Sequence, residues 1–93
     1  MRVFQTFNQG EAHYIAYITQ DVSQADLCVY ITKNQGLAYG ENRWFITNNK
    51  TQTDKTLFFG SRGSAQLVVC FVNSPALAGW QRNHPLQGKL CRF

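Results

Sequence analysis

The chain has 93 residues, a length that fits one domain. Hydrophobic residues make up 44% of it, aromatic residues 14% and charged residues only 15%, a composition that excludes a disordered chain. The net charge of +4 is too small to identify an anionic partner, and no apolar stretch reaches the ~20 residues that span a bilayer. Because the first residues also lack the apolar core of a secretory signal, we expect a cytoplasmic protein with no membrane partner.

A short unit recurs along the chain. Residues 11–19 match residues 24–32 at an offset of 13, and the second half of this unit is found six times. The pattern is a small or branched apolar residue, an aromatic residue, a variable residue and Thr, and five of the six copies have the aromatic. The copies lie at 3–6, 16–19, 29–32, 44–47, 57–60 and 69–72.

Each unit is typical of a strand followed by a turn. Val, Ile, Tyr, Phe and Thr dominate the strand part, while Ser, Asp and Asn occur in the part that follows. Side chains alternate between two rather apolar faces, which indicates a sheet covered on both sides or a barrel. The one helical candidate is a turn or two over residues 74–78, where Pro75 opens the segment and Gly79 closes it.

These units predict an all-β fold of about six short strands, with residues 1–93 as a single β-repeat domain and residues 74–93 as a divergent C-terminal cap. An antiparallel meander, which can curl into a small barrel, suits loops of five or six residues. The alternative is a short-rung β-solenoid in which each unit is one coil of a parallel stack. The sequence does not fix the direction of strand pairing.

The segment 23–32, together with Ala78-Gly79-Trp80, resembles a family of short bacterial proteins of uncharacterised function. Those proteins carry tandem S-x-A-D-x-x-V-[YF]-x-V repeats and end in A-G-W followed by a basic tail. The resemblance covers nearly the whole chain, is best at 22–32 and is looser at 33–62, where Gly36-Leu37-Ala38 replace the Ser-x-Ala-Asp turn. It implies a fold and supplies no catalytic residue.

The three cysteines form no metal-binding or disulfide pattern. Cys28 and Cys70 lie in strand-like runs, where Cys usually behaves as a small buried hydrophobe, and Cys91 lies near the C-terminus. An odd number without a C-x-x-C pair indicates reduced thiols. Whether any two of the three form a disulfide stays open.

Catalytic chemistry lacks support. The two histidines, His13 and His84, have no ligand spacing for a metal, and a Cys91–His84 pair would lack an oxyanion-stabilising group. The Gly/Ser loop 60–64 lacks the Lys-Ser/Thr ending of a phosphate-binding loop. We therefore expect a non-enzymatic protein without cofactor or metal.

By elimination, we expect a small protein-binding domain whose partner is another protein, and a narrower form of this hypothesis is an inhibitor or immunity-type neutraliser of a toxin or effector. The alternative is a module that binds single-stranded nucleic acid through aromatic and basic residues. Self-association through sheet edges is a further expectation. The candidate binding residues are aromatic and cationic side chains that lie mainly where the repeat breaks: Tyr39, Arg43, Trp44, Trp80 and Arg82.

Overall fold

The structure is a computed structural model that describes residues 1–90. It is all-β, as the repeat predicted, and no helix within these residues is long and apolar enough to cross a membrane. Six of its strands overlap the six copies of the unit. The strands are β1 (Arg2–Gln5), β2 (Tyr14–Ile18), β3 (Leu27–Ile31), β4 (Arg43–Thr47), β5 (Lys55–Phe59), β6 (Leu67–Val72) and β7 (Gly79–Trp80).

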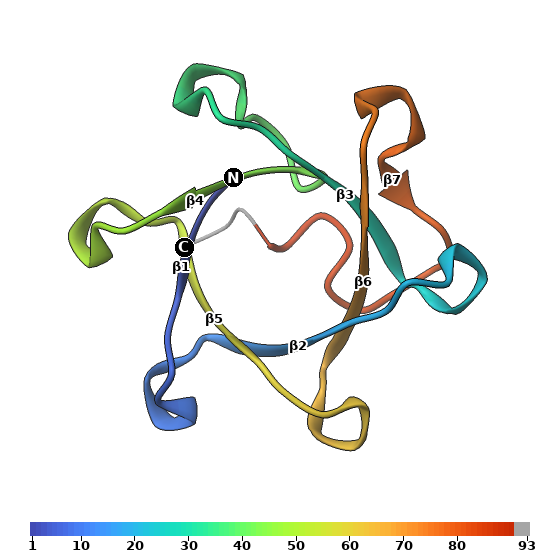
Figure 1. The fold of residues 1–93 in the computed structure, drawn as a ribbon. Helices are drawn as coiled ribbons and strands as arrows, with labels where there is room; N and C mark the ends of the chain where they lie inside the picture. The colour runs from blue at the N-terminus through green and yellow to red at the C-terminus, as the bar shows by residue number, and fades with distance from the viewer. Residues whose placement is uncertain (91–93) are drawn as a thin grey trace.

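A 3-10 turn follows each of the first six strands and projects outward from the barrel like a petal (Figure 1). The last of them falls inside the predicted 74–78 segment and has Pro75 at its first position. The six turns are η1 (Gln9–Glu11), η2 (Val22–Gln24), η3 (Gln35–Leu37), η4 (Lys50–Gln52), η5 (Arg62–Ser64) and η6 (Pro75–Leu77).

Strands β1 to β6 are hydrogen-bonded into a closed, wholly parallel ring, so the small barrel is confirmed and the antiparallel meander is wrong. Each connection, such as residues 6–13, leads from the carboxyl end of one strand back to the amino end of the next. The β-solenoid alternative correctly predicted that the strands run parallel. It was wrong about their arrangement, because the strands form one closed ring and not a stack of coils. Within residues 1–90, self-association through sheet edges would have no long unpaired edge to use.

The chain circles the barrel axis twice. Around the ring the strands follow the order β4, β1, β5, β2, β6 and β3, and β3 pairs again with β4. Within each circuit, β1 to β3 and β4 to β6, consecutive strands are therefore separated by one strand of the other circuit, whereas β3 and β4 are direct neighbours. The second circuit therefore inserts its strands between those of the first, and Figure 1 shows this as a star-like path of interleaved strands. The short β7 pairs antiparallel with the start of β3, whereas β4 pairs with the end of β3.

The repeated Thr and the Asn or Asp after it build four of the six petals. The Thr32 hydroxyl accepts the N–H of Asn34 at 3.1 Å, and the Asn34 side chain accepts the N–H of Gly36 at 2.9 Å. The Ala38 N–H then donates to the Gln35 carbonyl and ends the 3-10 turn. The same pair of side-chain hydrogen bonds opens the petals that begin at Asn8, Asp21 and Asn49. These polar residues satisfy the amides that a tight turn leaves without partners.

The residue before a strand joins it to a neighbour from the other circuit. The Asp26 N–H donates to the Val68 carbonyl at 2.8 Å, and the Asp26 carboxylate accepts the Val68 N–H at 2.9 Å. His13, Asp54 and Gln66 make the same two-bond bridge to Thr56, Arg2 and Ile15. These bridges set the register of parallel neighbours that are distant in sequence.

The first residue of every unit faces the barrel interior and is completely buried. These six residues are Val3, Ala16, Val29, Trp44, Leu57 and Val69. The aromatic at the second place points outward and is half-buried in every copy that has one. The amino end of the barrel is closed by Met1, Leu86 and Leu90, which pack on this core. At the carboxyl end, by contrast, the inward-facing Ile18, Ile46 and Phe71 are 40%, 40% and 38% exposed.

Candidate functional site

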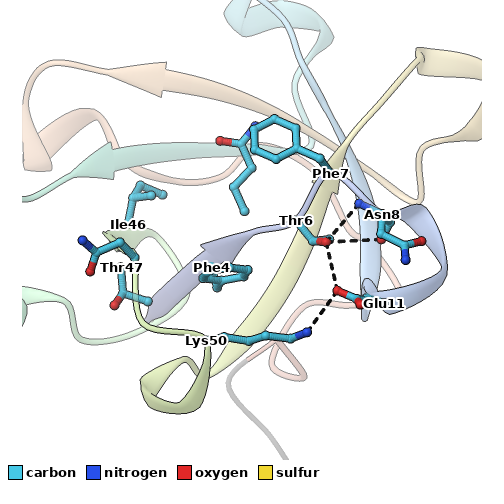
Figure 2. Close-up of a pocket in the computed structure, with 10 residues that line it drawn as sticks. Phe4, Thr6, Phe7, Asn8, Glu11, Ile46, Thr47 and Lys50 are labelled. Carbon is cyan, nitrogen blue, oxygen red and sulfur yellow. Dashed lines mark hydrogen bonds and ion pairs between the residues drawn. The ribbon is translucent and has the colours of Figure 1, made fainter.

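A groove of about 670 Å³ lies between the petals that follow β1 and β4. In Figure 2, Ile46 and Thr47 lie toward one side of this groove, Glu11 toward the other, and Phe4 between them. The groove begins near the exposed carboxyl end of the barrel because both strands end there. The lining residues are Phe4, Gln5, Thr6, Phe7, Asn8, Glu11, Ile46, Thr47, Asn48 and Lys50.

Phe7 is the most exposed large apolar side chain in the described residues, with 86% of its surface accessible. It follows the Thr6 hydroxyl that opens the first petal, a place that Gln20, Lys33 and Asn48 occupy in other copies. Nothing in the packing of the barrel accounts for a phenylalanine at that place. Comparison of the position after the repeated Thr could have singled it out from the sequence, but Phe7 was not among the predicted site residues.

The charged groups of this groove neutralise each other. Lys50 Nζ lies 3.0 Å from Glu11 Oε2, and the same carboxylate oxygen lies 3.4 Å from the Thr6 hydroxyl (Figure 2). The remaining polar lining consists of the amides Gln5, Asn8 and Asn48 and the hydroxyl of Thr47. The groove therefore offers apolar surface and hydrogen-bonding groups without an unpaired charge.

Two of the predicted binding residues form an exposed pair elsewhere on the surface. The Arg43 guanidinium carbon lies 4.5 Å from the centre of the Tyr39 ring, and Arg43 also donates a hydrogen bond to the Tyr39 hydroxyl. Tyr39 is 58% exposed. The pair contributes no lining to the groove at Phe7, so the predicted residues and that groove are separate features.

Trp44 belongs to the core. Its side chain is completely buried, and its indole Nε1 donates to the Glu41 carbonyl at 2.8 Å. It occupies the first place of its unit, where the other copies have Val, Ala or Leu, and it makes an edge contact with Phe71 at 6.1 Å between ring centres. A partner at the surface therefore has no access to this side chain in the folded state.

Trp80 and Arg82 hold the segment after β7 in place. The Trp80 indole donates to Glu41 Oε1 at 3.0 Å and stacks on His84 with ring centres 5.6 Å apart. Arg82 donates to the Ser23 carbonyl at 2.9 Å, and its Nε lies 3.6 Å from Asp26. These contacts explain why both residues depart from the repeat, since they bind the chain to itself.

A second groove of about 500 Å³ lies beside β6, between η2 and η6. Apolar side chains dominate its lining, and the sulfur-bearing Cys70 is among them. The lining residues are Gln20, Val22, Ile31, Cys70, Phe71, Val72, Asn73 and Leu77.

The histidines make structural hydrogen bonds. His13 Nδ1 accepts the Thr56 N–H at 2.9 Å, and His84 Nδ1 accepts the Leu86 N–H at 3.1 Å. No group of three metal-ligating side chains occurs within residues 1–90. Cys91, the sulfur of the Cys–His pair considered above, lies outside the described residues.

The match to a family model accords with the ring order described above. The model of the 7(1) septoil knot domain matches residues 1–81, whereas no curated protein and no solved structure matches the chain significantly. The family description names a knot, and in this chain the strands of the second circuit interleave with those of the first. This match does not test the resemblance to the proteins with S-x-A-D repeats, which stays a prediction. The chain belongs to the septoil knot domain family.

Proposed function

We propose that this chain is a small non-enzymatic protein-binding domain and that its partner docks in the groove beside Phe7. The observation that carries the proposal is the 86% exposure of Phe7 in a groove that Ile46, 40% exposed, also lines, in a chain that buries the first residue of all six units. Exposed apolar side chains gathered in a groove are typical of protein-interaction sites. Ile18 and Phe71, on strands that end at the same end of the barrel, are also partly exposed.

The electrostatics of the groove favour an uncharged partner segment. Its only charged residues, Glu11 and Lys50, are paired with each other at 3.0 Å, and a charged partner would have to compete with that pair. The amides of Gln5, Asn8 and Asn48 can bond to the backbone of an extended peptide. We therefore expect the partner to present apolar side chains on a segment without charge.

The pairing of Lys50 with Glu11 also disfavours binding of single-stranded nucleic acid, the alternative function, at this groove. Phosphate binding needs cations that can release their counterions. Lys50 is engaged by Glu11, Arg2 by Asp54 and Arg82 by Asp26. The Tyr39–Arg43 pair combines an exposed aromatic ring with a cation, and it is therefore the feature that favours the nucleic-acid alternative.

Selection from a random peptide library tests the proposal. The wild-type chain and the double variant Phe7→Ser/Ile46→Ser are immobilised, and peptides that bind only the wild type are sequenced and resynthesised. We expect uncharged sequences with apolar residues, and Phe7→Ala should weaken their binding at least about tenfold, the loss typical of an interface hot spot. Leu37→Ala is the matched control, because Leu37 is also exposed, at 51%, but lies on another petal.

Two outcomes would contradict the proposal. One is a library from which no peptide prefers the wild type, and the other is a set of peptides that bind the double variant equally well. Titration with labelled single-stranded RNA at low salt runs in parallel, and binding that Arg43→Ala abolishes while Phe7→Ala does not would favour the nucleic-acid alternative. If a natural partner with the selected motif is an enzyme, loss of its activity on binding would test the neutraliser form.

A further inference from the structure

Cys28 and Cys70 are direct neighbours across two strands that belong to different circuits of the chain. In the parallel pairing of β3 with β6, the Cα atom of Cys28 is in register with that of Cys70. Both residues alternate with buried core residues, Leu27 and Val29 on one strand and Val69 on the other, so both thiols lie on the outer face of the barrel. The sequence left the pairing of the cysteines open, and the ring order brings these two together.

The two thiols form a small cluster of their own beneath the petals. Cys28 is fully buried and Cys70 is 4% exposed, and they pack with Ala25 and Val72. Cys70 also lines the second groove, where Val22 and Leu77 are its apolar neighbours. One thiol of the pair therefore faces an open groove, while the other lies behind it.

We propose that Cys28 and Cys70 are a dithiol–disulfide site that a hydroperoxide entering the second groove oxidises. Neighbouring strands in a sheet lie about 4.8 Å apart, which is inside the range of about 4.4–6.8 Å between the Cα atoms of disulfide-bonded cysteines. In-register residues of a parallel pair point to the same face, so the two sulfurs can meet without a change in topology. This inference is independent of the groove at Phe7.

Because Cys70 and not Cys28 lines the second groove, Cys70 reacts first with the hydroperoxide and Cys28 reacts second. The Cys70 thiolate attacks the terminal peroxide oxygen; an S–O bond forms, the O–O bond breaks, and water or an alcohol leaves. The Cys28 thiol then attacks the Cys70 sulfenic acid; the S–S bond forms, the S–O bond breaks, and water leaves. Two thiols are oxidised and one peroxide is reduced. Burial, and secondarily the neighbouring Cys70, raises the pKa of the Cys28 thiol, which agrees with its role as the second, resolving thiol.

The experiment uses the full chain with Cys91→Ser, so that only this pair remains. After treatment with hydrogen peroxide, we expect intact mass spectrometry to show the loss of two hydrogen atoms. Tryptic digestion should then give the peptide that contains Cys28 joined to the peptide that contains Cys70. A thiol reductant should reverse both changes, and the oxidised chain should unfold at a higher urea concentration than the reduced chain because a long loop is closed.

Two further variants separate the roles of the thiols. Cys28→Ser/Cys91→Ser should accumulate a sulfenic acid on Cys70 that dimedone labels, and Cys70→Ser/Cys91→Ser should remain unlabelled; circular dichroism checks that each is folded. The proposal is overturned if the Cys91→Ser chain keeps two free thiols under peroxide. It is also overturned if the disulfide forms only between two chains, or if dimedone labels Cys28 in preference to Cys70.

Discussion

The Asp54 carboxylate accepts the backbone N–H of Arg2 at 2.7 Å and lies 3.0 Å from the guanidinium of the same residue. The Asp54 N–H donates in turn to the Arg2 carbonyl. Asp54, the residue before β5, therefore binds Arg2, the first residue of β1, through both its backbone and its side chain. Burial acts to raise the pKa of Asp54, but the hydrogen bonds and positive charge of Arg2 outweigh burial and hold that pKa below its ordinary value.

This pair predicts a specific loss of stability in acid. Because the folded-state pKa of Asp54 is depressed, its contribution is present above the unfolded-state value of about 3.9 and is lost as the pH falls through the folded-state value. We expect the urea midpoint of the wild type to fall as the pH is lowered below about 5, and Asp54→Asn to flatten that fall. Arg2→Gln should flatten it similarly.

Both variants should keep part of the dependence of stability on pH, because Asp21 also contributes to it. Hydrogen bonds from the Ser23 side chain and backbone lower the pKa of Asp21. Urea titrations at stepwise pH measure the effect. An Asp54→Asn chain with the full acid dependence of the wild type would show that the Arg2 contact contributes nothing to it.

Glu41 holds the segment after β7, and its removal should be costly. Its carboxylate accepts the Trp80 indole at 3.0 Å and the N–H groups of Gly88 and Leu90 at 2.8 Å and 2.6 Å. Hydrogen bonds to a charged group contribute about 1.5–3 kcal/mol each, and they are not independent here, so we expect Glu41→Ala to lower the free energy of unfolding by about 2–3 kcal/mol.

Glu11→Ala is the matched control for Glu41→Ala. Its carboxylate forms an exposed ion pair with Lys50, and such pairs contribute at most about 1 kcal/mol. Urea unfolding followed by tryptophan fluorescence gives both values. Equal losses in the two variants would mean that the contacts of Glu41 with residues 80–90 are not what stabilises that end of the barrel.

The petals offer a comparison between two cap residues. The Asn34 side chain accepts the Gly36 N–H at 2.9 Å, whereas the Ser61 side chain, at the equivalent place of η5, caps no N–H and bonds the Ser64 hydroxyl instead. Asn34→Ala should therefore cost about 1 kcal/mol of unfolding free energy, and Ser61→Ala only a few tenths of that. Chemical denaturation of both variants measures the difference. A larger loss for Ser61→Ala would contradict the capping role.

Two glycines of one loop should respond to alanine with opposite signs. A Cβ on Gly60 would lie 2.9 Å from the Phe58 ring and 3.2 Å from Ile15, whereas a Cβ on Gly63 would meet nothing within 4 Å. Neither backbone has a positive φ. We expect Gly60→Ala to destabilise by about 1–3 kcal/mol through overpacking. Gly63→Ala should be neutral or stabilise by up to about 1 kcal/mol, because it restricts the unfolded chain. Thermal melts of the two variants would test the signs.

Local structure could be predicted from the sequence because its causes are local. Alternating apolar residues placed the strands, and the Ser, Asp and Asn residues after them indicated the turns that follow. Asp26 and Asp54 lie in the segments between strands, where the repeat led us to expect Asp. Their bonds to Val68 and Arg2 could not be foreseen, because those residues are more than forty positions away. The candidate site was harder to predict, since a residue that departs from the repeat can do so to hold the chain, as Trp80 does, or to face solvent, as Phe7 does.

By itself, the sequence determined an all-β domain of six repeated strands, the residues of its turns and the absence of a recognisable catalytic motif. Only the tertiary structure decided that the strands run parallel and interleave over two circuits, that Trp44 is in the core, and that Cys28 meets Cys70. The physical reason is that alternation along a strand is the same whichever neighbour it pairs with. Direction and ring order follow instead from contacts between residues of different circuits, and a repeat of near-identical units carries little information about which copy pairs with which.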